Sequence, residues 1–382
     1  MSFAERLDDL TRCAAAPGVE EVLLEPELLA RQGRLDRRLV TELAEAARSA
    51  GVRAVLCWDT LLPQREFDLV TDELVEWNLT LFDAVRVRDL GAAMWLRQQH
   101  PDLPLQLIAE TGSHNFESLL GLCEAFAPAL ERLTLSSELT EGETGEFCRR
   151  LPVPCEVLGA GRILLFYSPR PLLSANFEPE EDDGWIEVLS ESEESGSRPF
   201  PTLETAHGTM MFYNRDLFQL DRLDGLRDAG LHSVRIDMRH LGTDETVTEG
   251  LVELCAAMAS GAEDLAELWP NRAIAPFFKA NKTTAQFKRL KSPLHQKRDE
   301  RCLAQVMAGQ RDRFLAYLVL RDFDVTEVGE VVLPTGDAVP VSGISFRDLE
   351  GQPVTRCEAG QVVTSGWLRR VCAASLLIAS SG

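Results

Sequence analysis

Residues 154–177 read PCEVLGAGRILLFYSPRPLLSANF, and this stretch decides how the rest of the chain is interpreted. Its apolar run at 163–166 leads into a proline-rich turn at 168–171. A short apolar segment that ends at a turn is typical of a buried strand followed by a loop. In α/β barrels and open α/β sheets, binding and catalytic sites lie at the carboxyl ends of strands. We therefore expect the loop after residue 168 to lie on the working face, that is, the face at the carboxyl ends of the strands where the functional site is expected.

Strand and helix patterns alternate on both sides of this stretch, about every 25 to 30 residues. Such alternation is typical of a parallel sheet with right-handed helical crossovers. It predicts the α/β class and, more narrowly, a TIM-like (β/α) barrel over residues 1–290, with 273–278 closing the ring. The expected strands are 19–25, 52–58, 82–91, 104–112, 129–140, 155–168, one at the start of 207–230, and 232–242.

Two further regions differ in composition from the barrel. Residues 178–205 are acidic and polar, and we expect a long insertion loop there, with at most one hairpin at 184–189. From residue 302 to 382, short apolar segments are separated by turns, which predicts a small all-β, barrel-like domain. The expected boundary is a basic linker at 291–301.

The overall composition places limits on the class of protein. Hydrophobic residues make up 45% of the 382 positions, and no apolar run is long enough to span a bilayer. The nine cysteines form no CxxC motif, and no secretory signal is visible, so we expect reduced thiols, the cytoplasm and no membrane. The net charge of −22 repels polyanions in general, and no DNA binding is expected.

One short region opposes this acidity, because all five lysines fall between residues 279 and 297. This basic patch is a candidate surface for phosphate or a partner molecule, and also for the acidic insertion itself. A solvated linker of no functional meaning explains it equally well. The patch residues of interest are Lys279, Lys282, Lys288, Arg289 and Lys291.

The usual catalytic fingerprints are absent from the sequence: there is no GxGxxG, GxxxxGK[ST], HExxH or GxSxG motif. Polar residues at the predicted strand ends are the better candidates, since a barrel brings them together at one mouth. Carboxylates crowded there suit acid–base work or a divalent cation. Asp59 and Asp89 precede helix patterns, and helix capping is the alternative for both. The proposed catalytic residues are Glu138, Asp237, Arg239, Tyr167 and Asn214, and the proposed substrate-binding residues are Glu25, Glu110, His114, Asn115, Arg162 and Arg170.

Several segments, taken in order, resemble the U32 peptidase family, the collagenase-like group. They are FDAVRVRDLGAAMWL, ETGSHNFESL, ERLTLSSELT, FYSPRPLLS, FYNRDL and GLHSVRIDMR, and the resemblance covers nearly the whole chain. The resemblance implies the following for well-understood members of the family: four cysteines hold an iron–sulfur cluster, and this cluster is used in oxygen-independent hydroxylation of ubiquinone precursors or RNA bases. Here Leu164 and Pro171 stand at two of those positions, and residues 175–205 contain no cysteine. Because such a cluster needs thiolates, we expect no iron–sulfur cluster and no cofactor, with a divalent cation as the alternative left open.

Three functional hypotheses follow. The first is a cluster-free U32-type protein that binds an anionic or macromolecular partner, either RNA or a cluster-bearing homologous subunit, in a hydroxylation or RNA-modification system. The second is a peptidase or other hydrolase that uses strand-end carboxylates such as Glu138 and Asp237, with or without a divalent cation. The third is a pseudo-enzyme with a structural role.

Overall fold

The structure is a computed structural model that describes residues 2–110, 112–179, 184–191, 199–241, 245–262, 264–276, 278–279, 299–341 and 343–380. The described residues belong to two compact units, one up to residue 279 and one from residue 299. Each unit has its own hydrophobic core. They are therefore treated separately below.

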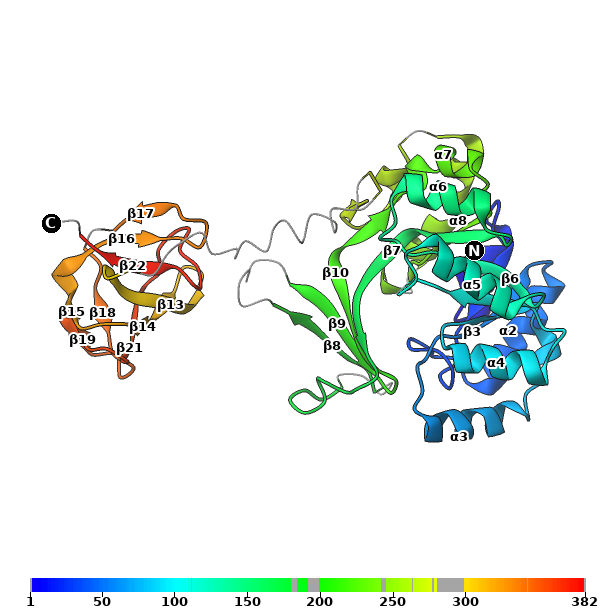
Figure 1. Ribbon diagram of the computed structural model, residues 1–382, viewed down its shortest axis with the longest axis horizontal. Helices are drawn as coiled ribbons and strands as arrows, with labels where there is room; N and C mark the ends of the chain where they lie inside the picture. The colour runs from blue at the N-terminus through cyan, green and yellow to red at the C-terminus, as the bar shows by residue number, and fades with distance from the viewer. Residues whose placement is uncertain are drawn as a thin grey trace. The chain divides into compact units, whose positions relative to one another are not determined.

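In the first unit, seven parallel strands pair in chain order and curl into a half-barrel, and β11 pairs in parallel with β7 (Figure 1). The α/β class predicted from the alternating pattern is confirmed. Among the described strands no ladder joins β11 back to β1, so closure into a full TIM barrel stays a prediction. The strands are β1 (Ser2–Phe3), β2 (Glu21–Leu24), β3 (Arg53–Trp58), β4 (Ala84–Val87), β5 (Leu105–Ile108), β6 (Leu130–Thr134), β7 (Cys155–Ser168) and β11 (Ser233–Ile236).

Helices connect these strands and bury their apolar faces against the sheet. Side-chain caps fix several helix starts: Asp36 accepts from the N–H of Leu39 at 2.7 Å, and Thr140 forms a capping box with Glu143. Among the described residues, no helix is both long and apolar enough to cross a bilayer. The α-helices are α1 (Leu7–Ala15), α2 (Arg37–Ser49), α3 (Gln64–Leu74), α4 (Leu90–Gln99), α5 (Phe116–Phe126), α6 (Glu141–Arg150), α7 (Asp224–Asp228) and α8 (Glu245–Ser260).

The sheet begins and ends differently from the sequence-based expectation. The first strand, β1, precedes the first predicted strand and pairs with β2. At the other end, β12 (Ala273–Ile274) pairs in parallel with β10 (Gly208–Phe218) and does not close the barrel. A two-residue strand carries too little pattern to be recognised in a sequence, which explains why β1 was not predicted. The segment of β12 was predicted, but a sequence pattern does not show which strand it pairs with.

The acidic insertion is more regular than predicted. β10 runs antiparallel to β7, β9 (Phe200–Thr205) pairs with β10, and β8 (Ile186–Ser190) pairs with β9 (Figure 1). These strands extend the half-barrel sheet on its β7 side. Parts of the predicted loop, residues 180–183 and 192–198, lie outside the described residues.

A buried carboxylate holds the loop that follows β7. Glu204 in β9 accepts hydrogen bonds from the backbone N–H groups of Leu172, Leu173 and Ser174 and from Thr209 Oγ1, the last at 2.8 Å. Burial would raise the pKa of Glu204, but these donors hold it below its usual value. The loop expected to form the working face is thus anchored to the insertion.

The second unit is all-β, as predicted. Its main sheet has the order β17-β16-β22-β13-β14-β21-β18-β19, and β15 pairs separately with β20. Tyr317 and Phe346 pack edge to face in its core, with ring centroids 5.3 Å apart. The strands are β13 (Cys302–Gln310), β14 (Phe314–Val319), β15 (Phe323–Asp324), β16 (Val328–Val332), β17 (Ala338–Pro340), β18 (Phe346–Arg347), β19 (Pro353–Val354), β20 (Arg356–Cys357), β21 (Val362–Gly366) and β22 (Leu376–Ala379).

Candidate functional site

The half-barrel strands place charged side chains in the interior. Side chains on a strand alternate between its two faces, so every second residue points the same way. Along β2 this gives Glu21, Leu23 and, just past the strand end, Glu25. The same period along β3 ends at Cys57 and Asp59. Each strand thereby contributes one inward polar group near its carboxyl end.

A network of buried charges lies below this end. Glu156 in β7 is fully buried and hydrogen-bonds to Arg86 of β4. Two further guanidiniums face it, with Arg132 at 3.7 Å and Arg235 of β11 at 3.9 Å. Arg132 also binds Glu21 at 2.6 Å and Arg235 also binds Glu110, so each of these buried charges has a partner of opposite sign, without which its burial would be costly.

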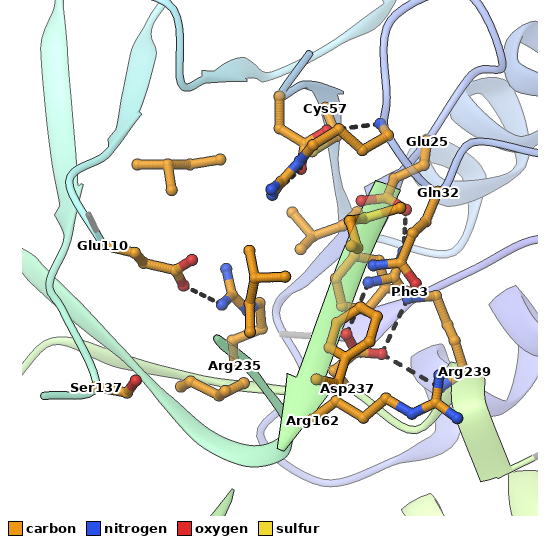
Figure 2. A pocket seen from close by; sticks show the side chains of 18 of the residues that line it. Phe3, Glu25, Gln32, Cys57, Glu110, Ser137, Arg162, Arg235, Asp237 and Arg239 are labelled. Atoms are coloured by element: carbon orange, nitrogen blue, oxygen red, sulfur yellow. Dashed lines mark hydrogen bonds and ion pairs between the residues drawn. The ribbon is translucent and has the colours of Figure 1, made fainter. Parts of the chain in front are cut away.

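Above the network is a pocket of about 100 Å³ (Figure 2). Both charges and apolar groups line it, and they come from the ends of the half-barrel strands and from β7 and β10. Its lining residues are Phe3, Leu23, Glu25, Arg31, Gln32, Cys57, Asp59, Arg86, Ile108, Glu110, Ser136, Ser137, Glu138, Leu158, Arg162, Leu164, Met210, Phe212, Arg235, Asp237, Arg239 and His240.

The first paired group in the pocket follows β11. Arg239 binds Asp237 through two nitrogens, Nε at 2.9 Å and Nη2 at 2.7 Å, and also contacts Glu25 (Figure 2). Its guanidinium carbon lies 3.5 Å from the centroid of the Phe3 ring. Burial would raise the pKa of Asp237, but Arg239 holds it well below its usual range. Asp237 therefore stays ionised, and both of its carboxylate oxygens accept hydrogen bonds from Arg239.

The approach of Asp237 to β7 depends on a glycine. Gly161 has φ of +145°, and a Cβ at this position would lie 2.9 Å from Cβ of Asp237. The register between β7 and its neighbours shifts in this region, between Arg235 and Ile236 on the β11 side. The glycine allows the two backbones to come close together where the pocket forms.

A second paired group joins the ends of β2 and β3. Arg31 donates from Nε to Asp59 at 2.8 Å, and its backbone N–H binds the same carboxylate at 2.8 Å. Burial would raise the pKa of Asp59, but Arg31 keeps it below its usual value. Burial raises the pKa of nearby Glu25 to about 7 despite Arg239. Asp59 thus stays ionised, whereas Glu25 holds its proton up to near neutral pH.

Arg162 differs from the other pocket arginines. It lies in β7 opposite Asp216 of β10, and its guanidinium carbon is 5.3 Å from the centroid of the Phe212 ring. No described carboxylate lies within ion-pair distance of it. Burial lowers the pKa of Arg162, because the cation is partly removed from water without a close counter-ion. Its guanidinium is suited to bind an incoming anion.

The structure brings some of the predicted site residues together and separates others. Glu25, Glu110, Glu138, Arg162, Asp237 and Arg239 all line the pocket. Glu110 is bound to Arg235 (Figure 2).

The remaining predicted site residues do not line the pocket: they are Tyr167, Asn214, His114, Asn115 and Arg170. Tyr167 donates its hydroxyl to the carbonyl of His207 at 2.9 Å, and its ring lies under Arg31. His114 Nε2 is 3.0 Å from Oγ of Ser136. Asn115 caps α5, as Asp89 caps α4. Of the basic patch, Lys279 is described and exposed, and Lys282, Lys288, Arg289 and Lys291 lie outside the described residues.

Sequence reasoning missed Arg31, Arg235 and His240 as pocket residues. Arg235 could have been found from strand periodicity, because it lies two residues before Asp237 and shares its inward face. Arg31 lies in an irregular loop and His240 in a short turn, where no period applies. Only their positions in space connect them to the pocket.

The donor groups of the chain do not fit a four-thiolate cluster. All nine cysteines are in the described residues and are free thiols. One set of three or more potential metal ligands converges among the described residues: Glu25, Cys57 and Asp59, whose ligand atoms lie within 4.8 Å of one another. It contains a single thiol, whose pKa burial raises well above its usual value. Its two carboxylates already bind guanidiniums, so a cation would have to displace them.

Comparison with known proteins gives the family. The model of peptidase family U32 matches residues 12–267. The chain belongs to the U32 peptidase family. A curated U32 relative, the tRNA hydroxylation protein P2 of Bacillus subtilis strain 168, is 24% identical over 214 residues, which are 54% of this chain and 67% of that protein.

Solved structures resemble the U32 chain only weakly. The U32 peptidase Mk0906 gives a TM-score of 0.34 with 12% identity over 42% of this chain and 68% of that one. The spore cortex-lytic enzyme SleL of Bacillus megaterium QM B1551 gives 0.31 with 9% identity over 61% and 66%. Likenesses at this level carry no argument about function.

Proposed function

We propose that this U32 protein binds RNA in a modification system and takes a nucleotide of that RNA into the pocket at the strand ends. The observation that carries the proposal is Arg162, a pocket arginine with no described carboxylate within ion-pair distance. Next to it, Phe212 offers an aromatic ring, and bases stack on such rings. The tRNA hydroxylation protein P2 supports RNA as the partner, because it is a relative of this chain.

Oxidising chemistry in such a system would come from a second, cluster-bearing homologous subunit. The cysteines of this chain do not converge on a cluster site, and the resemblance places Leu164 where relatives carry a ligand. Leu164 packs against a small apolar cluster with Leu203 and Met210. Protein purified without oxygen should be colourless and hold far less than one iron per chain. Stoichiometric iron with a brown colour would contradict this part of the proposal.

The RNA-binding test uses fluorescence anisotropy with labelled tRNA and compares Arg162→Ala with wild type. Loss of a charge-assisted contact is worth about 1.5–3 kcal/mol, so we expect affinity to fall roughly tenfold or more. The slope of log affinity against log salt should also become less steep by about one, as for the loss of one phosphate contact. Arg65→Ala is the matched control: it removes the same charge from the exposed surface of α3 and should bind like wild type. Equal binding by wild type and Arg162→Ala would refute the proposal.

The hydrolase alternative is weaker. Asp237, one of its two proposed carboxylates, is held by two hydrogen bonds from Arg239 and cannot act as a base without leaving that partner. A pseudo-enzyme role predicts that pocket variants change neither RNA binding nor modification. The Arg162→Ala comparison therefore also separates this third hypothesis from the first.

A further inference from the structure

A histidine–carboxylate pair borders the pocket. His240 lies in the short turn Arg239–Leu241 after β11 and lines the pocket, and Asp216 lies in β10. Nε2 of His240 is 2.8 Å from Oδ2 of Asp216, and both side chains are only 6% exposed. The two residues are 24 positions apart, so the fold and not the local sequence creates the pair.

The surroundings of Asp216 fix the orientation of this pair. Nε1 of Trp269 donates to the same Oδ2 atom at 2.9 Å, and the Trp269 ring lies 6.4 Å from the His240 ring, measured between centroids. Burial would raise the pKa of Asp216, but hydrogen bonds from His240, Trp269 and Asn271 hold it below its usual value. The carboxylate is therefore ionised and can only accept. It follows that Nε2 of His240 carries the hydrogen in this hydrogen bond, so the lone pair of an unprotonated ring lies on Nδ1.

That Nδ1 atom is available to a ligand. Among the described residues it has no hydrogen-bond partner, and His240 is one of the residues that line the pocket. The neighbouring charged residues Asp237 and Arg239 form an ion pair with each other. Arg162, the proposed anion-binding residue, lies opposite Asp216 in the ladder between β7 and β10. A ligand held by Arg162 would thus lie in the same pocket as the lone pair of His240.

We infer that His240 is a proton acceptor for the molecule bound in the pocket, with Asp216 as its positioning residue. A weakly acidic N–H or O–H of a bound nucleobase or nucleotide gives its proton to Nδ1, and the electron pair stays on the ligand nitrogen or oxygen. The Asp216 carboxylate stabilises the imidazolium, which returns the proton to product or solvent. The inference rests on the pocket being the ligand site of the proposed function, and it adds a chemical step to that function.

The first experiment needs no RNA. Diethyl pyrocarbonate acylates unprotonated imidazole nitrogens, and mass spectrometry locates the modified residues. We expect His240 to react in the folded wild-type protein, with exposed His232 as the internal standard. Asp216→Asn should slow acylation of His240 at an unchanged melting temperature, because an asparagine amide can donate to Nε2 and move the ring hydrogen to Nδ1. Unmodified His240 beside fully acylated His232 would overturn the inference.

The second experiment measures the chemical step. In cells whose tRNA modification depends on this chain, His240→Gln should lower the modified nucleoside about 100-fold or more, as for loss of a general base. Its tRNA affinity should stay within about twofold of wild type, and His232→Gln should change neither quantity. Normal nucleoside levels in His240→Gln would overturn the inference. If Arg162→Ala binds tRNA normally while His240 is still acylated, the RNA proposal fails and the proton acceptor stands.

Discussion

The buried charge network predicts that two substitutions of the same type, Glu156→Gln in the interior and Glu146→Gln on the surface, differ greatly in how much stability they cost. Glu156→Gln keeps the shape of the side chain but removes the carboxylate that Arg86, Arg132 and Arg235 share. Glu156 is 0% exposed and Arg86 is 1% exposed, so water cannot replace the lost partner. Arg86 would lose its hydrogen-bonded carboxylate in the interior, whereas Arg132 keeps Glu21 and Arg235 keeps Glu110. We expect this variant to be one of the most destabilising single changes in the first unit.

The expected size follows from what buried pairs lose when one partner is removed. Such losses are about 3–5 kcal/mol, because the remaining charge is left buried and uncompensated. For a unit of this size, each kcal/mol lowers the melting temperature by roughly 2–4 °C. Glu156→Gln should therefore melt about 6–20 °C below wild type. Its urea midpoint should fall with little change in m, since the surface exposed on unfolding is the same.

Urea unfolding followed by tryptophan fluorescence is a suitable assay, because five of the six tryptophans lie in the first unit and only Trp367 lies in the second. The control is Glu146→Gln, which removes an exposed i,i+4 pair with Arg150 on α6. Exposed pairs of this kind contribute at most about 0.5 kcal/mol. If both variants lose less than about 1 kcal/mol, Glu156 is not needed to compensate the buried charge of Arg86, and the reasoning is refuted.

Three further outcomes follow from individual contacts. Glu204 has a lowered folded pKa, so the stabilisation from its anchoring of the 172–174 amides should be complete above the unfolded pKa of about 4.3 and be lost as pH falls through the lower folded pKa. Glu204→Gln should speed hydrogen exchange of these amides at neutral pH, and unchanged exchange would contradict this. Glu25 has a folded pKa raised to about 7, so stability should decline as pH rises from about 4.3 to 7; Glu25→Gln should abolish that decline in urea midpoints, and a persisting slope would assign it to another group. Gly161→Ala should cost about 1–3 kcal/mol through its contact with Asp237, whereas Gly121→Ala, open on helix α5, should be neutral or stabilising, and equal midpoints would argue against the tight approach of β7 and β11.

The order of the half-barrel strands could be predicted from the sequence because each of the strands from β2 to β6 is followed by a helical pattern. In the insertion a hairpin was expected within 184–189, whereas β8 pairs with β9, which was not predicted. Their residues lie among many acidic side chains, and an edge hairpin with one exposed face does not need an apolar run. Leu189, for example, is 67% exposed although it lies within β8.

The candidate site could be predicted only where it follows strand ends. Glu25, Glu110 and Asp237 fit that rule, because a strand carries its last inward residue to the mouth whatever its partners are. The rule does not identify the partner of each carboxylate. Arg31 reaches Asp59 from a loop, and His240 meets Asp216 across 24 residues, so these pairs depend on the tertiary fold.

The paired charges also explain how an acidic protein can offer a site to an anion. At physiological salt, exposed charges more than about 8 Å apart are largely screened, so the net charge of −22 acts mainly on the rate of encounter. Affinity then depends on the groups lining the pocket. There Asp59, Asp237 and Glu110 are each bound to an arginine of the same pocket and repel an incoming phosphate less than free carboxylates would. Under the proposed function, Arg162, with no described carboxylate within ion-pair distance, would favour an anion in this pocket.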